Sequence, residues 1–354
     1  MFKIIDLYIA RTLLSTIAVT LSVLVGLSAL IKFVEQLRRI GQGDYDMTIA
    51  ALYVFLSLPR EIELFLPMAT LLGALIGMGL LAQSSELVVM QASGLSRTNI
   101  TLSSMKSVVL IIIAMMAIGE FITPPSETKA KELRTQALSG GSVLSSDNVT
   151  WAKDGNDFVS ISQVIDQDSL RDIEVYKFDD SLNLTQIMTA QSADFTQRNW
   201  ILTDVTIMDF GERQIDRISL PELQWDSSLT PDKLGIVAIK PEALSIRGLL
   251  DYVGYLENNG QDASRYELAL WRKIFQPFSV AVMLLLAMSF IFGPLRSVTM
   301  GARTIMGVLA GFGFFISNEV FGQVSLVFQL PPILGAVIPS ILFAMISAIL
   351  LKRQ

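Results

Sequence analysis

Six long apolar segments, split into two groups of three by a polar stretch, constrain the fold of this chain most strongly. A helix that crosses a bilayer needs roughly 20 apolar residues. The apolar segments lie at residues 12–31, 64–82, 101–121, 274–295, 305–330 and 333–351. The composition, with 51% hydrophobic and 17% charged residues, is that of a membrane protein. The sequence therefore predicts six transmembrane helices.

The first segment is predicted to remain as a helix rather than to be cleaved as a signal peptide. It is longer than a typical signal core, and Lys32 follows it instead of the small residues of a cleavage site. Basic residues at the chain ends and in alternate loops place both termini in the cytoplasm. The opposite side also carries cations, namely Lys32, Arg38, Arg39, Arg60, Arg272 and Lys273.

The polar stretch between the two groups has the pattern of a β domain. Residues 124–265 contain 23 acidic and 13 basic residues, a net charge of −10. Apolar and polar residues alternate over 148–164, 172–178 and 200–210, with turn-forming residues between these runs. This spacing predicts an antiparallel sandwich or jelly roll. The predicted class is membrane α plus β, with an antiparallel β jelly-roll domain inserted between transmembrane helices 3 and 4.

The predicted boundaries follow from these patterns. Residues 1–137 carry the first three helices, 138–243 form the β domain, and 244–354 carry a helical connector and the last three helices. Pro59 and Pro67 are expected to kink or break the second helix, because proline removes a backbone donor and clashes with the preceding turn.

Several functional classes are excluded by what the sequence lacks. It contains no cysteine and no histidine, so thiolate catalysis, disulfides and imidazole metal ligands are impossible. It has no phosphate-binding loop, nucleophile elbow or zinc motif, and no basic footprint for nucleic acid. We therefore expect no catalytic residue, no metal site and no cofactor bound by this chain.

The connector at residues 83–95 between the second and third helices is a candidate docking element. Gly94 is expected to end its helix. The residues near one of its faces are Glu86, Leu87, Met90 and Gln91. Spacing alone favours equally a coupling helix that docks on a cytoplasmic motor and an ordinary interfacial helix.

Basic residues predicted near the outer ends of the helices are candidate phosphate ligands. These cations are Lys32, Arg38, Arg39, Arg60, Lys131 and Arg134. Together they can surround the mouth of a cavity, since guanidinium and ammonium groups are common phosphate donors. The alternative is that long side chains simply reach out to the interface. A charge within the membrane costs about 2.5–3.5 kcal/mol, which favours a function for Lys32, whereas the alternative is favoured for Arg38 and Arg39 taken singly.

Two acids and three aromatic residues complete the candidates. Glu120 and Glu319 lie in or at the edge of predicted spans, where an acid is either functional or paired with a neighbouring helix. Phe65, Phe312 and Phe315 are candidate walls of an acyl-chain cavity, and the alternative for each is a packed or lipid-facing position.

Segments spread over the chain resemble one known family. They are residues 31–37, 41–43, 81–94, 151–156, 229–235, 273–279 and 289–297. They resemble the LptF/LptG permease family of the lipopolysaccharide export transporter of Gram-negative inner membranes. The resemblance implies a multi-pass inner-membrane subunit whose jelly roll is periplasmic, with lipopolysaccharide entering between the first span of one subunit and the fifth span of the other.

The resemblance also implies partners and residue roles. The partners are LptF in a pseudo-twofold heterodimer, two copies of the ATPase LptB, which uses ATP and Mg, and the single helix of LptC beside the first span. The family's coupling glutamate falls on Glu86, and its cavity-mouth cations fall on the six basic residues given above. Arginine stands at 38, 39 and 60, where the family often has lysine, so the charge is kept but the donor geometry is not.

The function expected from the resemblance is ATP-driven extraction of lipopolysaccharide and its transfer to a periplasmic bridge toward the outer membrane. Two alternatives remain at this point. One is a mechanical transmitter that couples an ATPase to a periplasmic domain without carrying substrate. The other is a membrane-anchored assembly scaffold without a motor.

Overall fold

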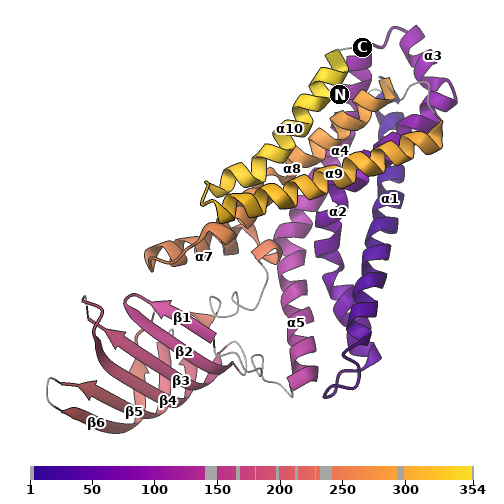
Figure 1. The fold of residues 1–354 in the computed structure, drawn as a ribbon. Coiled ribbons are helices and arrows are strands. Elements are labelled where there is room, and N and C mark those ends of the chain that lie inside the picture. The colour runs from indigo at the N-terminus through magenta and orange to yellow at the C-terminus, as the bar shows by residue number, and fades with distance from the viewer. Residues whose placement is uncertain are drawn as a thin grey trace.

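Six helices form a bundle, and a β-sheet lies beyond one end of it (Figure 1). The structure is a computed structural model that describes residues 4–139, 150–164, 168–179, 181–196, 199–211, 214–227, 229–231, 241–292 and 299–352. By length and composition, six helices can cross a membrane: Ile4–Leu37, Met47–Gln83, Arg97–Leu138, Ser264–Phe292, Thr304–Val327 and Pro332–Lys352. The predicted membrane α plus β class, with six apolar helices and a sheet between the third and fourth, is confirmed.

The first half of the bundle consists of three long helical segments and a short connector. Its elements are α1 (Ile4–Leu37), α2 (Met47–Gln83), α3 (Glu86–Ala92), α4 (Arg97–Ala117), the π-helical turn η1 (Ile118–Ile122) and α5 (Thr123–Ser139). Of the expected kink or break, the break does not occur, because α2 runs unbroken through Pro59 and Pro67. Most of the apolar part of α2 is buried by its neighbours, and this packing offsets the cost of proline inside a helix.

The second half begins with the connector that the apolar spacing of residues 245–259 predicts. Its elements are the 3₁₀ turn η2 (Pro241–Ala243), α7 (Ile246–Asn258), α8 (Ser264–Phe292), α9 (Met300–Val327) and α10 (Pro332–Lys352). The side chain of Ser245 caps α7 by accepting a hydrogen bond from the Gly248 amide. Gly260, at φ +61°, follows the helix in the left-handed conformation that glycine adopts easily.

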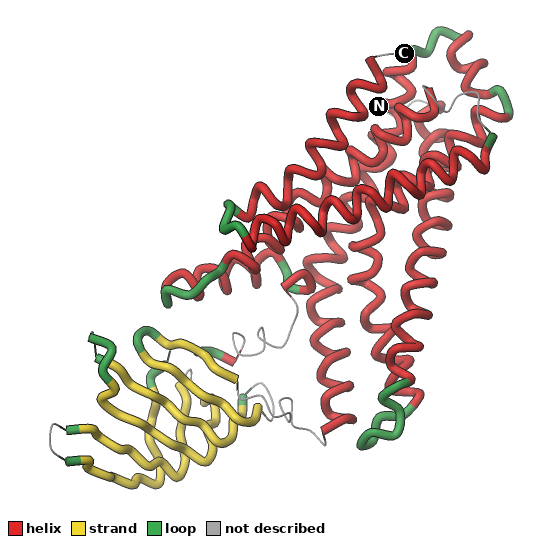
Figure 2. Tube along the Cα trace, viewed as in Figure 1, coloured by secondary structure: helices red, strands yellow, loops and turns green. Residues whose placement is uncertain are grey.

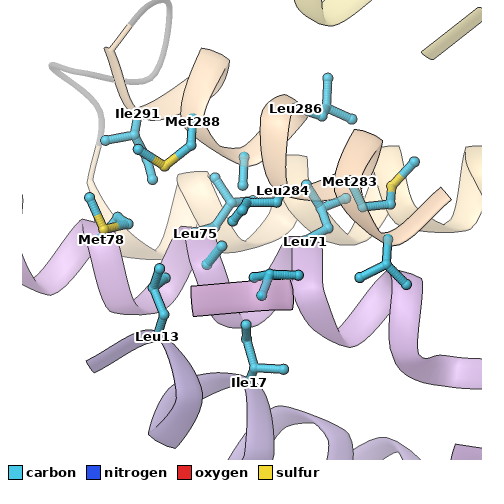
Figure 3. Packing of buried hydrophobic residues seen from close by; sticks show 14 of the residues in the cluster. Leu13, Ile17, Leu71, Leu75, Met78, Met283, Leu284, Leu286, Met288 and Ile291 are labelled. Carbon is cyan, nitrogen blue, oxygen red and sulfur yellow. The ribbon is translucent and has the colours of Figure 1, made fainter. Parts of the chain in front are cut away.

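The core of the bundle lies where α1, α2 and α8 meet (Figure 3). The figure labels Leu13 and Ile17 from α1, Leu71 and Leu75 from α2, and several residues of α8. The α1 and α2 backbones approach closely at Gly73, because a Cβ added there would lie 2.5 Å from the Cα of Ile17. Small residues permit such close packing of membrane helices, where dispersion rather than the hydrophobic effect holds helices together.

The β domain is one six-stranded antiparallel sheet. Its strands are β1 (Thr150–Asp154), β2 (Asp157–Val164), β3 (Ser169–Phe178), β4 (Leu184–Thr196), β5 (Asn199–Phe210) and β6 (Ile215–Trp225). They pair in sequence order, as a meander of hairpins. A jelly roll also contains crossover connections between strands that are not consecutive. The described strands have no such connection, because each pairs with its neighbours in sequence. Sequence patterns did not single out β4 and β6, which have small or exposed residues at positions where alternation would be read.

The apolar face of the sheet packs against α7. Trp200 is fully buried, and its indole Nε1 donates a hydrogen bond to the carbonyl of Leu229 at 2.7 Å. The hydroxyl of Tyr255 on α7 donates to the Lys153 carbonyl at 2.7 Å, and burial raises the pKa of Tyr255 to about 12. The Tyr255–Lys153 hydrogen bond fixes α7 to the β1–β2 hairpin, so the connector belongs structurally to the sheet.

The two ends of the bundle differ in what they carry. Both labelled termini and α3 lie at one end, whereas the sheet and the far end of α5 lie at the other (Figures 1 and 2). The backbone amide of Asp44, in the turn between α1 and α2, donates to the Ala137 carbonyl near the end of α5 at 2.8 Å. This contact holds α5 beside the first two helices where it extends toward the sheet.

Candidate functional site

The short helix α3 lies at the end of the bundle with the termini, and its first turn carries Glu86. The hydroxyl of Tyr8 on α1 donates to Glu86 Oε2 at 2.6 Å, and Ser84 donates to Glu86 Oε1 at 2.8 Å. These hydrogen bonds, chiefly that from Tyr8, lower the pKa of the Glu86 carboxyl. The structure therefore holds Glu86 ionised at the surface and connects it to the beginning of the first span.

The face of α3 that points outward differs from the face that the sequence predicts. Leu87 is buried in the core of the bundle, and Met90 packs partly against that core. Val88 and Val89 are instead 55% and 66% exposed. Gly94, at φ +94°, ends the helix region as predicted. The apolar surface offered by α3 thus comes from the two valines.

Lys32 lies on α1 and has a carboxylate partner on α2. Its Nζ is 2.6 Å from Glu61 Oε1, and the side chains of Lys32 and Glu61 are 26% and 6% exposed. The hydroxyl of Ser28 also donates to Glu61. A cation near the membrane edge is thereby neutralised within the chain, as the high cost of an unpaired charge demands.

The other predicted cations of α1 and α5 have different surroundings within this chain. Arg38 and Arg39 lie in the exposed turn after α1. On α5, the Arg134 guanidinium lies 5.2 Å from the centre of the Tyr53 ring and donates to its hydroxyl at 3.4 Å. Lys131, one turn before Arg134, is half-buried.

Arg60, on α2, lines a cavity of about 720 Å³. Its Nη2 is 3.5 Å from Glu242 Oε2 on η2. The charged residues that line the cavity come from α2, η2, α8 and α9: Arg60, Glu63, Glu242, Arg265, Arg272, Lys273 and Glu319. Its apolar lining includes Leu64, Pro67, Met68, Phe314, Phe315 and Leu326. The cavity thus joins a basic, polar wall to an apolar one.

Arg272 bridges α8 to α9 at this cavity. Its Nη2 donates to the Asn318 carbonyl at 2.6 Å, and its Nη1 is 3.4 Å from Glu319 Oε2. Its Nε is buried and has no hydrogen-bond partner among the described residues. A Cβ added to Gly322 would lie 2.1 Å from Nη2 of Arg272, so this glycine makes room for the guanidinium on α9. Glu319 thus has an ion-pair partner on a neighbouring helix.

The three predicted aromatic residues have different surroundings. Phe315 lines the cavity, together with Phe314, which also packs edge-on against Phe343. Phe312 is 55% exposed on the outer surface of α9, and Phe65 is half-buried on α2. Neither Phe312 nor Phe65 is among the residues that line the cavity.

A buried polar joint surrounds the π-helical turn η1. The Lys273 ammonium on α8 lies 3.5 Å from Glu63 Oε2 and donates to the carbonyls of Gly119 and Leu244 at 2.9 and 2.7 Å. Glu120 accepts a hydrogen bond from the Ile246 amide at 2.8 Å. Thus Glu120 pairs with backbone at the start of α7, and the joint ties α2, η1 and α8 to the connector of the sheet.

Sequence reasoning left the α8 cations and the acids Glu61, Glu63 and Glu242 out of the candidate site. A signal existed for Arg272 and Lys273, since two adjacent cations precede the fourth apolar segment just as Lys32 follows the first. Within the described residues no group of three or more acidic side chains is placed to hold a metal ion.

Comparisons with known proteins cover nearly the whole chain. Residues 7–353 match the family model described as lipopolysaccharide export system permease LptF/LptG. The chain is 49% identical over 356 residues to the lipopolysaccharide export system permease protein LptG of Escherichia coli strain K12, with 100% of this chain and 99% of the relative covered. It is 48% identical, with the same coverage, to the protein of that name from Haemophilus influenzae.

Proposed function

Because this chain belongs to the LptF/LptG family of lipopolysaccharide export permeases, we propose that it is a transmembrane subunit of an ATP-driven transporter for lipopolysaccharide. The transporter extracts lipopolysaccharide from the inner membrane and passes it to a periplasmic bridge toward the outer membrane. The observation that carries this proposal is the near-half identity to named export permeases over the full length of both chains.

The proposed assembly places the chain in a pseudo-twofold pair with LptF, above two copies of the ATPase LptB and beside the helix of LptC. The ATPase binds ATP and Mg, and this chain binds neither. The termini and α3 lie at one end of the bundle and the sheet at the other, which supports cytoplasmic termini and a periplasmic sheet in a multi-pass inner-membrane protein. A strand edge of the sheet then continues the bridge by pairing with the next β domain.

In the proposed cycle, α3 contacts the ATPase and moves when the ATPase changes conformation. Glu86 is ionised, and Val88 and Val89 are exposed beside it, so α3 offers one charged and two apolar contacts to a groove on the motor. Because Tyr8 bonds to Glu86, movement of α3 is transmitted to the first span.

The substrate is held by charge at its phosphates and by apolar contact at its acyl chains. Each CH₂ of an acyl chain that leaves the bilayer for water costs about 0.8 kcal/mol of free energy. Contact with the apolar wall of the cavity offsets part of this cost, and ATP hydrolysis provides the remaining free energy. The cavity-mouth cations bind the phosphates, with Lys32 released from Glu61 when the substrate arrives.

The test uses the purified complex with LptF, LptB and LptC in proteoliposomes. Glu86→Ala should abolish ATP-dependent release of lipopolysaccharide, and Glu35→Ala, an exposed acid on α1, should not. Lys32→Asp should weaken photo-crosslinking of lipopolysaccharide to the cavity. Full transport by Glu86→Ala contradicts the docking role. ATP hydrolysis without any lipopolysaccharide movement by the unmodified complex favours the mechanical transmitter instead.

A further inference from the structure

We propose that the bundle contains a hinge layer, at which the end near the sheet bends relative to the end that carries α3. The hinge layer consists of Pro67 in α2, the π-helical turn η1 in the third span, Pro277 in α8 and Pro339 in α10. Lys273 and Gln276 on α8 are its positioning residues, because they donate hydrogen bonds to carbonyls that have lost their helical donors. The inference rests on the proposed function and deepens it, since it states where the membrane helices move during transport.

Pro67 leaves one carbonyl of α2 without its helical donor. Proline has no backbone N–H, so the carbonyl four residues earlier, that of Glu63, receives no hydrogen bond from residue 67. Glu63 is buried, and a buried carbonyl without a partner is costly. The Gln276 side chain donates from Nε2 to this carbonyl at 2.6 Å. A neighbouring helix thus supplies the hydrogen bond that α2 itself cannot make.

The π-helical turn leaves a second carbonyl in the same condition. In a π-helix each N–H donates to the carbonyl five residues earlier, as the Thr123 amide does to Ile118. The next carbonyl, that of Gly119, would need the N–H of residue 124, which is a proline. The Lys273 ammonium donates to the Gly119 carbonyl at 2.9 Å. Therefore α8 supplies the missing donors of both α2 and the third span.

The donors on α8 lie beside a proline of their own. Lys273 and Gln276 are three residues apart, so they share one face of α8. Pro277 removes the helical donor of the Lys273 carbonyl, just as Pro67 removes that of Glu63. Lys273 Nζ is also 3.5 Å from Glu63 Oε2. The two residues whose carbonyls are freed by prolines are therefore an ion pair, which places both prolines at the same level of the bundle.

A hydrogen bond extends the layer to α10. The hydroxyls of Ser279 on α8 and Ser340 on α10 share a hydrogen bond at 2.8 Å. Pro277 and Pro339 lie directly before these serines, and Pro339 is buried inside α10. Sharp bends in helices occur almost only at prolines and at π-helical turns. Because four helices have such a feature at contacting positions, they can bend together.

The parts of α2 on either side of Pro67 have different neighbours. Before Pro67, the Tyr53 hydroxyl accepts a hydrogen bond from Arg134 on α5 at 3.4 Å. After Pro67, Leu71 and Leu75 pack in the core against α8 (Figure 3). The part of α2 after the hinge layer therefore stays with α8, whereas the part before it follows α5 toward the sheet.

The first experiment is a double-mutant cycle on thermal unfolding of the full chain in detergent. Gln276→Leu should lower the Tm by roughly 2–6 °C, because the buried Glu63 carbonyl loses its donor. Pro67→Ala restores a backbone N–H to that carbonyl and should raise the Tm. In the Pro67→Ala background, Gln276→Leu should change the Tm little. Equal losses in both backgrounds, or a lower Tm for Pro67→Ala, overturn the assignment of Gln276.

The second experiment measures lipopolysaccharide released per ATP hydrolysed by the complete complex in proteoliposomes. It uses Pro277→Ala, because Pro277 lies outside the cavity lining. This variant regains a hydrogen bond within α8, so it should have a higher Tm but should release about twofold less lipopolysaccharide per ATP, or lower still. Misfolding cannot produce a variant that is both more stable and less coupled.

Pro332→Ala is the matched control, because Pro332 is the first residue of α10, where proline frees no helical carbonyl. Its release per ATP should equal that of the unmodified complex. An unchanged ratio for Pro277→Ala overturns the hinge layer while the proposed function stands. Absence of release by the unmodified complex contradicts the proposed function instead.

Discussion

Replacing Gly73 by alanine tests whether the first two spans pack backbone to backbone. The added Cβ would lie 2.5 Å from the Cα and 2.8 Å from the amide nitrogen of Ile17. Ordinary carbon contacts begin near 3.5 Å, so α1 must move away from α2 by about 1 Å. Because the obstacle is helix backbone, no side-chain rotation relieves the clash.

The magnitude follows from two opposing terms. Overpacking a tight interface costs about 1–3 kcal/mol, and a clash with backbone belongs at the upper end. Alanine returns up to about 1 kcal/mol, since it favours the helix more than glycine does. We therefore expect Gly73→Ala to destabilise the protein by about 2 kcal/mol, which corresponds to a fall of roughly 4 °C in the apparent Tm.

The measurement is thermal unfolding of the detergent-solubilised protein, followed by intrinsic fluorescence. Alanine variants of two other glycines serve as controls. At Gly77 the nearest atom to an added Cβ is the Thr16 side-chain hydroxyl at 2.6 Å, which can rotate, so Gly77→Ala should cost less. At Gly26 no atom lies within 4 Å, so Gly26→Ala should leave the Tm unchanged or slightly raised. Equal Tm values for the Gly73 and Gly26 variants would refute the close approach of α1 to α2.

Three other perturbations probe the sheet and α3. Trp200→Phe should destabilise the β domain by about 1–3 kcal/mol in thermal unfolding, because the buried Leu229 carbonyl loses the hydrogen bond from the Trp200 indole. Burial raises the pKa of the Asp157 carboxyl above its unfolded value, so its ionisation on raising the pH through the folded pKa opposes folding. Asp157→Asn should therefore raise the Tm at about pH 7 and not at about pH 3, where the carboxyl is protonated in both states; the reverse pattern contradicts the burial argument. Tyr8→Phe should raise the pKa of Glu86, because the carboxylate loses the Tyr8 hydrogen bond. In the proposed complex with the ATPase, coupled transport should then be lost at a higher pH when the medium is acidified.

Local patterns in the sequence predicted the six spans and part of the sheet, but not β4, β6 or the contacts between elements. Apolar length predicted six spans because each helix must satisfy its own backbone in lipid. Gly94 ended its helix region where expected, since it adopts the left-handed conformation. In contrast, the unbroken course of α2 through Pro59 and Pro67 depends on its burial between neighbours, which no local pattern records.

The candidate site shows the same division. Lys32 and Arg60 were predicted as phosphate ligands, but their carboxylate partners were not predicted. Glu242 lies 182 residues away from Arg60 along the chain, so no local pattern links these two residues. Leu87 was assigned to the docking face from its spacing, yet the bundle buries it, since a short helix can turn either of two apolar faces inward. Such choices are made by packing across the bundle.

The polar joint at η1 determines which membrane helices a force on the sheet would reach. The sheet is fastened to α7 by the Tyr255–Lys153 hydrogen bond, and the beginning of α7 is fastened to Glu120. Lys273 bonds to the neighbouring Leu244 carbonyl and to the carbonyl of Gly119 within the third span. A force applied to the sheet is therefore transmitted through these hydrogen bonds to the interior of the third and fourth spans, so that movement of the sheet and movement of the membrane helices are coupled.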